Sequence, residues 1–122
     1  YKKNIMGIKI DCVLVDEVQF FSKHHINELM KIVDKLDVPV ICYGLRLDYR
    51  LEPFESTSYL MAIADELEEL RTICSNCGRK KANINARVNE EDGSIITTGE
   101  QIEIGGNEKY RPLCRKCFNE LK

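Results

Sequence analysis

The 122 residues are enough for one modest domain, or for one domain with a small appendage. So short a chain is expected to need a stabilising cross-link or a partner. The formal net charge of -2 arises from interleaved acidic and basic residues, which argues against a nucleic-acid partner. No apolar run approaches the ~20 residues that span a bilayer, and nothing resembles a signal peptide. We therefore expect no membrane partner and a cytoplasmic location.

The first half of the chain has the pattern of alternating strands and helices. Residues 8–15 form a mostly apolar, β-branched run, which predicts a strand buried on both faces. Ser22 can cap a helix whose apolar residues recur at helical spacing: Ile26, Leu29, Met30, Val33 and Leu36. Residues 40–43 predict a second buried strand. Strand, helix and strand at this spacing predict parallel strands joined by a right-handed crossover.

The middle of the chain is less regular. Residues 45–55 carry charge without a period and are predicted to form a loop. Thr57 or Ser58 can cap a second helix with three inward side chains: Leu60, Met61 and Ala64. Residues 67–73 fit either a continued helix or a strand, and the sequence leaves both open.

The last part of the chain predicts short antiparallel strands. The apolar residues alternate, at Ile84, Ala86 and Val88 and again at Ile102 and Ile104. Turns are expected at residues 92–93 and 105–107. We place a boundary near Thr72, with an α/β domain over residues 1–72 and a zinc-binding module over residues 73–122.

Four of the six cysteines form two Cys-x-x-Cys pairs: Cys74 with Cys77, and Cys114 with Cys117. Four thiolates complete the closed tetrahedral shell of a structural zinc site. The 36 residues between the pairs (78–113) exceed the spacing found in a compact zinc ribbon. The ion is therefore expected to hold together the two ends of a long loop. The alternatives are redox pairs or four unrelated thiols. Cys12 and Cys42 lie in apolar runs and are expected in the core.

Asp16 and Glu17 follow the first predicted strand in a Walker-B-type pattern. At the carboxyl end of a parallel strand, Asp16 can hold Mg²⁺, and Glu17 can take a proton from a nucleophile. The alternative is an ordinary strand followed by a polar turn. Asp-Glu-Val-Gln is also similar to the box of nucleic-acid-dependent helicases, but their further motifs are not found downstream.

Three blocks in order over residues 11–117 resemble the cytosolic, zinc-containing thymidine kinases: Asp-Glu-Val-Gln-Phe-Phe at 16–21, Val-Pro-Val-Ile-Cys-Tyr-Gly-Leu-Arg at 38–46, and Ile-Gly-Gly-Asn-Glu-Lys-Tyr at 104–110. The resemblance implies a P-loop ATPase-like parallel sheet, followed by a small zinc-ribbon-like β module with a lasso loop. It implies phosphorylation of the 5′-hydroxyl of thymidine or deoxyuridine by ATP with Mg²⁺, giving dTMP for deoxynucleotide salvage. It also implies a homotetramer with dTTP as feedback inhibitor.

The same resemblance assigns roles to individual residues. Glu17 is the general base, and Asp16 lies on the Mg²⁺–phosphate side. The apolar walls around the nucleoside base come from four residues: Phe20, Leu45, Tyr49 and Phe54. Tyr49 stands where phenylalanine is common, so its added hydroxyl needs a partner. The lasso contributes Tyr110 and the backbone that reads the pyrimidine edge: Gln101, Ile102, Glu103, Ile104 and Gly105.

The family's phosphate loop, Gly-x-x-x-x-Gly-Lys-[Ser/Thr], is expected upstream of Tyr1, and this chain without it is expected to be inactive. One alternative function is a non-enzymatic zinc module that binds nucleic acid or protein. That alternative explains the cysteines but leaves Asp16 and Glu17 without a role. Another is a different P-loop ATPase, which would tolerate the loss of Tyr110, whereas a nucleoside kinase should not.

Overall fold

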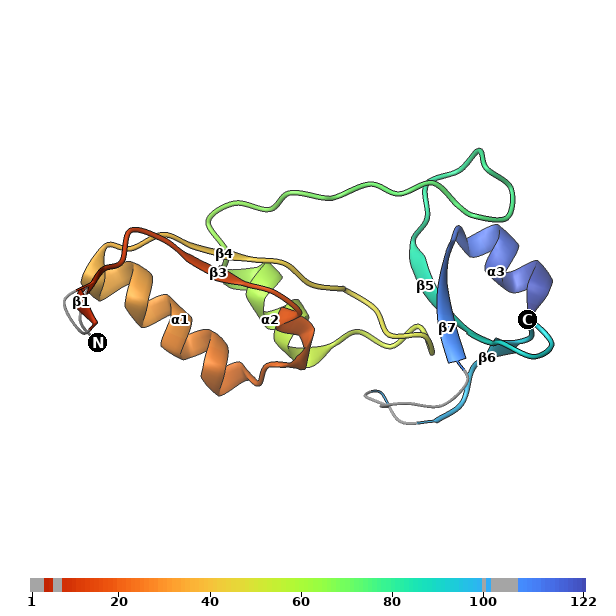
Figure 1. Ribbon diagram of the computed structural model, residues 1–122, viewed down its shortest axis with the longest axis horizontal. Coiled ribbons are helices and arrows are strands. Elements are labelled where there is room, and N and C mark those ends of the chain that lie inside the picture. Colours follow the sequence, from red (N-terminus) through yellow and green to blue (C-terminus); the bar gives the residue numbers. More distant parts are fainter. Residues whose placement is uncertain (1–3, 6–7, 100, 102–107) are drawn as a thin grey trace. The chain divides into compact units, whose positions relative to one another are not determined.

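The computed structural model describes residues 4–5, 8–99, 101 and 108–122, which form helices and strands (Figure 1). They divide into two compact units, each described by itself. The first unit comprises Tyr1–Arg46 and Phe54–Asp65, and the second unit comprises Leu47–Pro53 and Glu66–Lys122. The α/β class is confirmed, whereas the boundary near Thr72 stays a prediction. None of the helices described is long and apolar enough to cross a bilayer.

The first unit contains β1 (Asn4–Ile5), β2 (Ile8–Lys9), β3 (Val13–Val15), the 3-10 turn η1 (Val18–Phe20), α1 (Lys23–Leu36), β4 (Val40–Cys42) and α2 (Glu55–Ile63). β3 and β4 pair in parallel and α1 connects them, as predicted. The strand predicted over residues 8–15 is divided into β2, which pairs antiparallel with β1, and β3, which pairs with β4. Cys42 is half-buried, but Cys12 is exposed, and its predicted place in the core is wrong.

Among the described residues, only one face of the β3–β4 pair is covered within the first unit. Val15, Val18 and Ile26 form the buried core, and side chains of α1 and α2 pack around it. On the other face, Leu14 is 66% exposed and its register partner Ile41 is 46% exposed. The predicted burial on both faces is therefore wrong for this part of the chain. Side chains alternate between the faces of a strand, and the helices cover only one of them.

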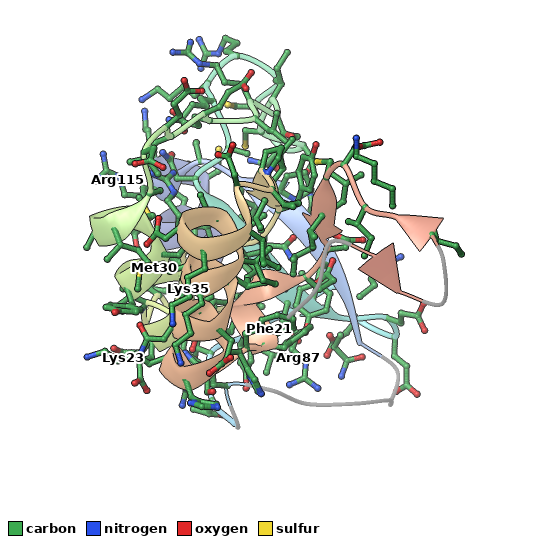
Figure 2. The ribbon with its side chains drawn as sticks, turned by 90° about the vertical axis from the view of Figure 1, so that its left-hand side faces the viewer. Phe21, Lys23, Met30, Lys35, Arg87 and Arg115 are labelled. Atoms are coloured by element: carbon green, nitrogen blue, oxygen red, sulfur yellow. The ribbon has the colours of Figure 1, made fainter. Side chains whose placement is uncertain are left out.

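The two helices of the first unit begin differently. Ser22 caps α1 as predicted, because its Oγ accepts a hydrogen bond from the backbone N–H of His25. Phe21 packs against the core beside this helix start. Figure 2 labels both Phe21 and Lys23, the first residue of α1. α2 begins at Glu55 without a side-chain cap, so the predicted cap at Thr57 or Ser58 is wrong. Both residues lie inside the helix.

The second unit contains β5 (Ile84–Asn89), β6 (Ile95–Ile96), β7 (Glu108–Leu113) and α3 (Arg115–Leu121). The strands form an antiparallel sheet in the order β6-β5-β7, with the predicted turn at residues 92–93 between β5 and β6. Residues 66–72 form neither helix nor strand. The strand predicted around Ile102 and Ile104 and the turn at 105–107 lie outside the described residues.

The core of the second unit is built where the sheet meets α3 (Figure 1). The predicted strand is confirmed, and Ile84, Ala86 and Val88 are all buried, but Arg87 between them is buried too. The core cluster joins apolar side chains of the sheet and of α3 to cysteines of both pairs: Ile84, Ala86, Leu113, Phe118, Cys74, Cys114 and Cys117. The cysteine cluster therefore lies inside the hydrophobic core rather than on a loop surface.

Candidate active site and metal centre

The carboxyl end of β3 places Asp16 and Glu17 directly before η1. Both residues are exposed. The backbone N–H of Glu17 donates to Asp16 Oδ1 at 2.9 Å, and Glu17 has φ 55° and ψ 43°. This left-handed conformation is uncommon for a residue other than glycine, and it is often found where function requires it. The backbone N–H of Val18 donates to the carbonyl of Tyr43 at 2.9 Å, which ties the turn to the end of β4.

Gln19 joins Glu17 to the segment that follows β4. Its Nε2 donates to Glu17 Oε2 at 2.5 Å, and its Oε1 accepts from the backbone N–H of Leu45 at 3.2 Å. Gln19 is only 4% exposed. Sequence reasoning missed this residue, because its second partner, Leu45, lies 26 positions further along the chain.

The predicted site residues of the first unit lie around this turn. Phe20 belongs to η1 and packs edge-to-face on Phe54, with ring centroids 6.4 Å apart. Phe54 is buried, whereas Phe20 is 51% exposed and Leu45 is 40% exposed. The structure therefore packs Phe20 against Phe54 and links Glu17 to the backbone of Leu45 through Gln19.

The remaining predicted residues belong to the second unit. Tyr49 is 3% exposed, and its hydroxyl donates to the carbonyl of Thr98 at 3.3 Å. This bond is the partner that the tyrosine was predicted to need. The guanidinium of buried Arg87 (Figure 2), on β5, lies 5.1 Å from the Tyr49 ring centroid. Tyr110 on β7 is half exposed and pairs in register with Arg87. Four predicted residues lie outside the described residues: Ile102, Glu103, Ile104 and Gly105.

The segment Leu47–Pro53, which we call the clasp, is held by one buried carboxylate that sequence reasoning missed. Asp48 accepts hydrogen bonds from the backbone of Arg50 and Glu52 and from the Arg50 guanidinium. Burial opposes the ionisation of Asp48, but these hydrogen bonds lower the pKa of its carboxyl. The ion pair with Arg50 spans 3.0 Å.

The clasp binds the segment that follows β6. Besides the bond from Tyr49, Arg50 Nη1 donates to the carbonyl of Gly99 at 3.1 Å, and Gln101 Nε2 donates to the carbonyl of Pro53 at 3.3 Å. These bonds connect residues 48 or 49 positions apart in the chain. Gln101, predicted to read a pyrimidine through its backbone, is anchored here through its side chain.

The four paired cysteines meet in one cluster, as predicted. Their sulfur atoms all lie within 4.8 Å of one another, and Cys74, Cys114 and Cys117 are buried. A tetrahedral ion with metal–sulfur bonds of ~2.3 Å needs sulfur atoms about 3.8 Å apart. Cys114 caps α3, and Cys117 lies in the first turn of that helix. The cluster can therefore hold a metal ion.

The charge balance of the cluster also favours a cation. Burial opposes the ionisation of Cys74, yet hydrogen bonds from the backbone of Cys114, Cys77 and Asn76 lower the pKa of its thiol to about 6. The side chain of Asn76 favours an ionised Cys117, but burial and the neighbouring thiols raise the pKa of Cys117 to about 11. Thiols this close cannot all ionise unless a positive ion offsets their charge.

These features define a mixed α/β protein with an acidic site at the end of a parallel strand and a four-cysteine centre for a metal ion. The family described as "Thymidine kinase" matches this sequence over residues 1–118. The chain therefore belongs to the thymidine kinase family.

Individual relatives agree with this assignment. A thymidine kinase of Mannheimia succiniciproducens is 50% identical over 119 residues, which cover 98% of this chain and 60% of that protein. One from Haemophilus influenzae is 54% identical over 112 residues, covering 92% and 56%. One from Shouchella clausii is 55% identical over 106 residues, covering 87% and 54%. The chain thus spans somewhat more than half the length of these relatives.

Proposed function

We propose that this chain forms the nucleoside side of a thymidine kinase, which transfers the γ-phosphoryl group of ATP to the 5′-hydroxyl of thymidine or deoxyuridine, giving dTMP from thymidine. The observation that carries this proposal is the Glu17 carboxylate at the end of β3, which Gln19 links to the backbone of Leu45, while the side chains of Phe20 and Leu45 are exposed. Relatives named thymidine kinase, about half identical to this chain, supply the substrate class. The parallel β3–β4 pair would belong to a P-loop ATPase-like sheet.

The proposed chemistry uses Glu17 as the general base. As the 5′-oxygen forms its bond to the γ-phosphorus and the bond to the departing ADP oxygen breaks, the hydroxyl proton passes to Glu17. Phe20, Leu45 and Phe54 would hold the pyrimidine, and Tyr110 would cover the nucleoside from the lasso. Together they would exclude water, which would otherwise compete as acceptor. Asp16 would hold Mg²⁺ through its exposed carboxylate, and the bound ion would neutralise phosphate charge.

We propose that the metal of the cysteine cluster is zinc in a structural site. An all-thiolate set leaves no open coordination position for substrate, and such closed sites stabilise a fold rather than perform chemistry. The ion would join the segment before β5 to the start of α3, and thus both ends of the region that carries Tyr110. By resemblance to the family, the complete enzyme would be a cytoplasmic homotetramer inhibited by dTTP.

The test is a transfer assay on the natural full-length protein with γ-labelled ATP. Label should move to thymidine and yield dTMP, and 5′-deoxythymidine, which lacks the acceptor oxygen, should receive none. Failure to form dTMP would reject the proposed function. Salt-dependent binding of nucleic acid together with indifference to thymidine would instead support the non-enzymatic zinc module.

A further inference from the structure

The Gln19 amide is buried beside the proposed base, and the structure determines which way round it lies. A glutamine oxygen and nitrogen are hard to tell apart by shape, so hydrogen-bond partners must assign them. The backbone N–H of Leu45 can only donate, so the atom that meets it at 3.2 Å must be Oε1. The NH₂ group then faces Glu17 Oε2 at 2.5 Å and donates to it. One amide thus links the carboxylate of Glu17 to the backbone of Leu45.

The framework around Gln19 leaves this amide little freedom. The buried Ser56 hydroxyl donates to the carbonyls of Val18 at 3.1 Å and Gln19 at 2.9 Å. On the other side, a Cβ atom at Gly44 would approach Val18 Cγ1 to 2.6 Å and Gln19 Oε1 to 3.0 Å. Only glycine at position 44 lets the end of β4 come this close to η1. The backbone and the side chain of Gln19 are therefore both held in place.

We propose that Gln19 is a positioning residue of the kinase, which orients the Glu17 carboxylate and keeps it in register with the apolar surface at Leu45. This inference rests on the proposed function, because it takes Glu17 as the base. An exposed glutamate otherwise samples several rotamers, and fixing one of them spares that ordering when substrate binds. Since Leu45 is held by the other end of the same amide, the base and the nucleoside surface keep a constant separation.

A double-mutant cycle on the full-length protein tests whether Gln19 acts through Glu17. Gln19→Met keeps the length of the side chain but removes both hydrogen bonds. In the presence of Glu17 it should lower kcat about 10- to 100-fold, the scale on which misplaced catalytic groups lose rate. In the Glu17→Gln background it should lower kcat less than about threefold, because the carboxylate that it positions is gone.

The matched control is Tyr59→Phe, which removes the hydrogen bond to Asn27 in the same unit and touches neither Glu17 nor Gln19. This control substitution should change kcat by the same factor whether position 17 is Glu or Gln. If Gln19→Met behaves in the same way, Gln19 is merely structural and the inference is overturned. If Glu17→Gln retains near-normal turnover, the base assignment fails, and this inference fails with it.

A second substitution covers the case in which Gln19→Met does not fold, as judged by metal content and thermal unfolding. Gln19→Glu keeps an acceptor for the N–H of Leu45 but sets a carboxylate against that of Glu17. When Glu17 is present, Gln19→Glu should lower kcat at least as much as Gln19→Met does. Combined with Glu17→Gln, it should regain stability, because position 17 then donates to position 19. Absence of that recovery would contradict the proposed hydrogen bond.

Discussion

The two units bury their cores with different chemistry. In the first unit, Val15, Val18 and Ile26 pack beneath a strand pair whose other face carries exposed Leu14 and Ile41. In the second unit, cysteines of both pairs lie within the apolar core of the sheet and α3. Apolar packing therefore holds the first unit, whereas the core of the second unit also contains cysteines that can hold a metal ion. The proposed base and the cysteine cluster lie in different units, so each can be perturbed separately.

Cys77→Ser should produce the largest effect, confined to the second unit. Removing one thiolate from a closed four-thiolate site should abolish stoichiometric metal binding, because binding and folding are coupled in such sites. Metal analysis and hydrogen exchange of β5 and β7 provide the measurement. Exposed Cys12 supplies the control, since Cys12→Ser should retain the metal. Full metal content in Cys77→Ser would contradict the four-cysteine centre.

Glu17→Gln should be the next largest change, and it concerns the first unit alone. Turnover should fall by roughly 10²–10⁴-fold, the usual contribution of a general base, with metal content unchanged. Steady-state kinetics of the full-length protein measure it. Glu28→Gln, the same chemical change on the surface of α1, should leave kcat within about twofold. Normal turnover of Glu17→Gln would remove the proposed base.

Asp48→Asn should weaken the clasp, at a cost of about 2 kcal/mol in unfolding free energy, because several charge-assisted hydrogen bonds are lost. The effect should depend on pH. The pKa of Asp48 is lowered in the folded chain, so its stabilisation is complete above the unfolded value of about 4 and disappears as pH falls through the folded value. Denaturant unfolding between about pH 2 and pH 6 measures this. A variant with the same acid sensitivity as the parent would show that Asp48 is not responsible.

Tyr49→Phe should give the smallest effect. It removes the bond to Thr98 but keeps the ring under the guanidinium of Arg87, so stability should fall by only about 0.5–1.5 kcal/mol. Thermal unfolding compares it with Tyr59→Phe, which loses the 2.6 Å bond to Asn27 in the first unit. If Tyr49 lines a nucleoside site, its substitution should also change KM for thymidine, whereas Tyr59→Phe should not.

Local spacing accounts for the features that could be predicted. The Cys-x-x-Cys pairs, the Ser22 cap with the helical period after it, and the strand β5 each depend on residues only a few positions apart. Backbone geometry converts such spacings directly into structure. The order of strand, helix and strand followed from the same patterns, and the family resemblance rested on contiguous blocks of sequence.

The clasp and Gln19 show what spacing cannot reveal. Arg50 and Gly99 are 49 positions apart, and no period connects them. In the sequence, Gln19 is simply a polar residue after a predicted strand. Its hydrogen bond to the backbone of Leu45 forms only in the folded chain. The start of α2 was also misplaced, because the helix begins at Glu55 without a side-chain cap, and Thr57 and Ser58 lie inside it.

The order of strand, helix and strand, the four-cysteine cluster and the family could all be read from the sequence, because they depend on short-range geometry and on ordered motifs. Folding was needed to show which face of the β3–β4 pair is covered, what holds the Glu17 carboxylate, and that Leu47–Pro53 belongs with the unit that contains the cysteine cluster. These outcomes depend on hydrogen bonds and packing between segments far apart in the chain. Such contacts exist only once the chain is folded.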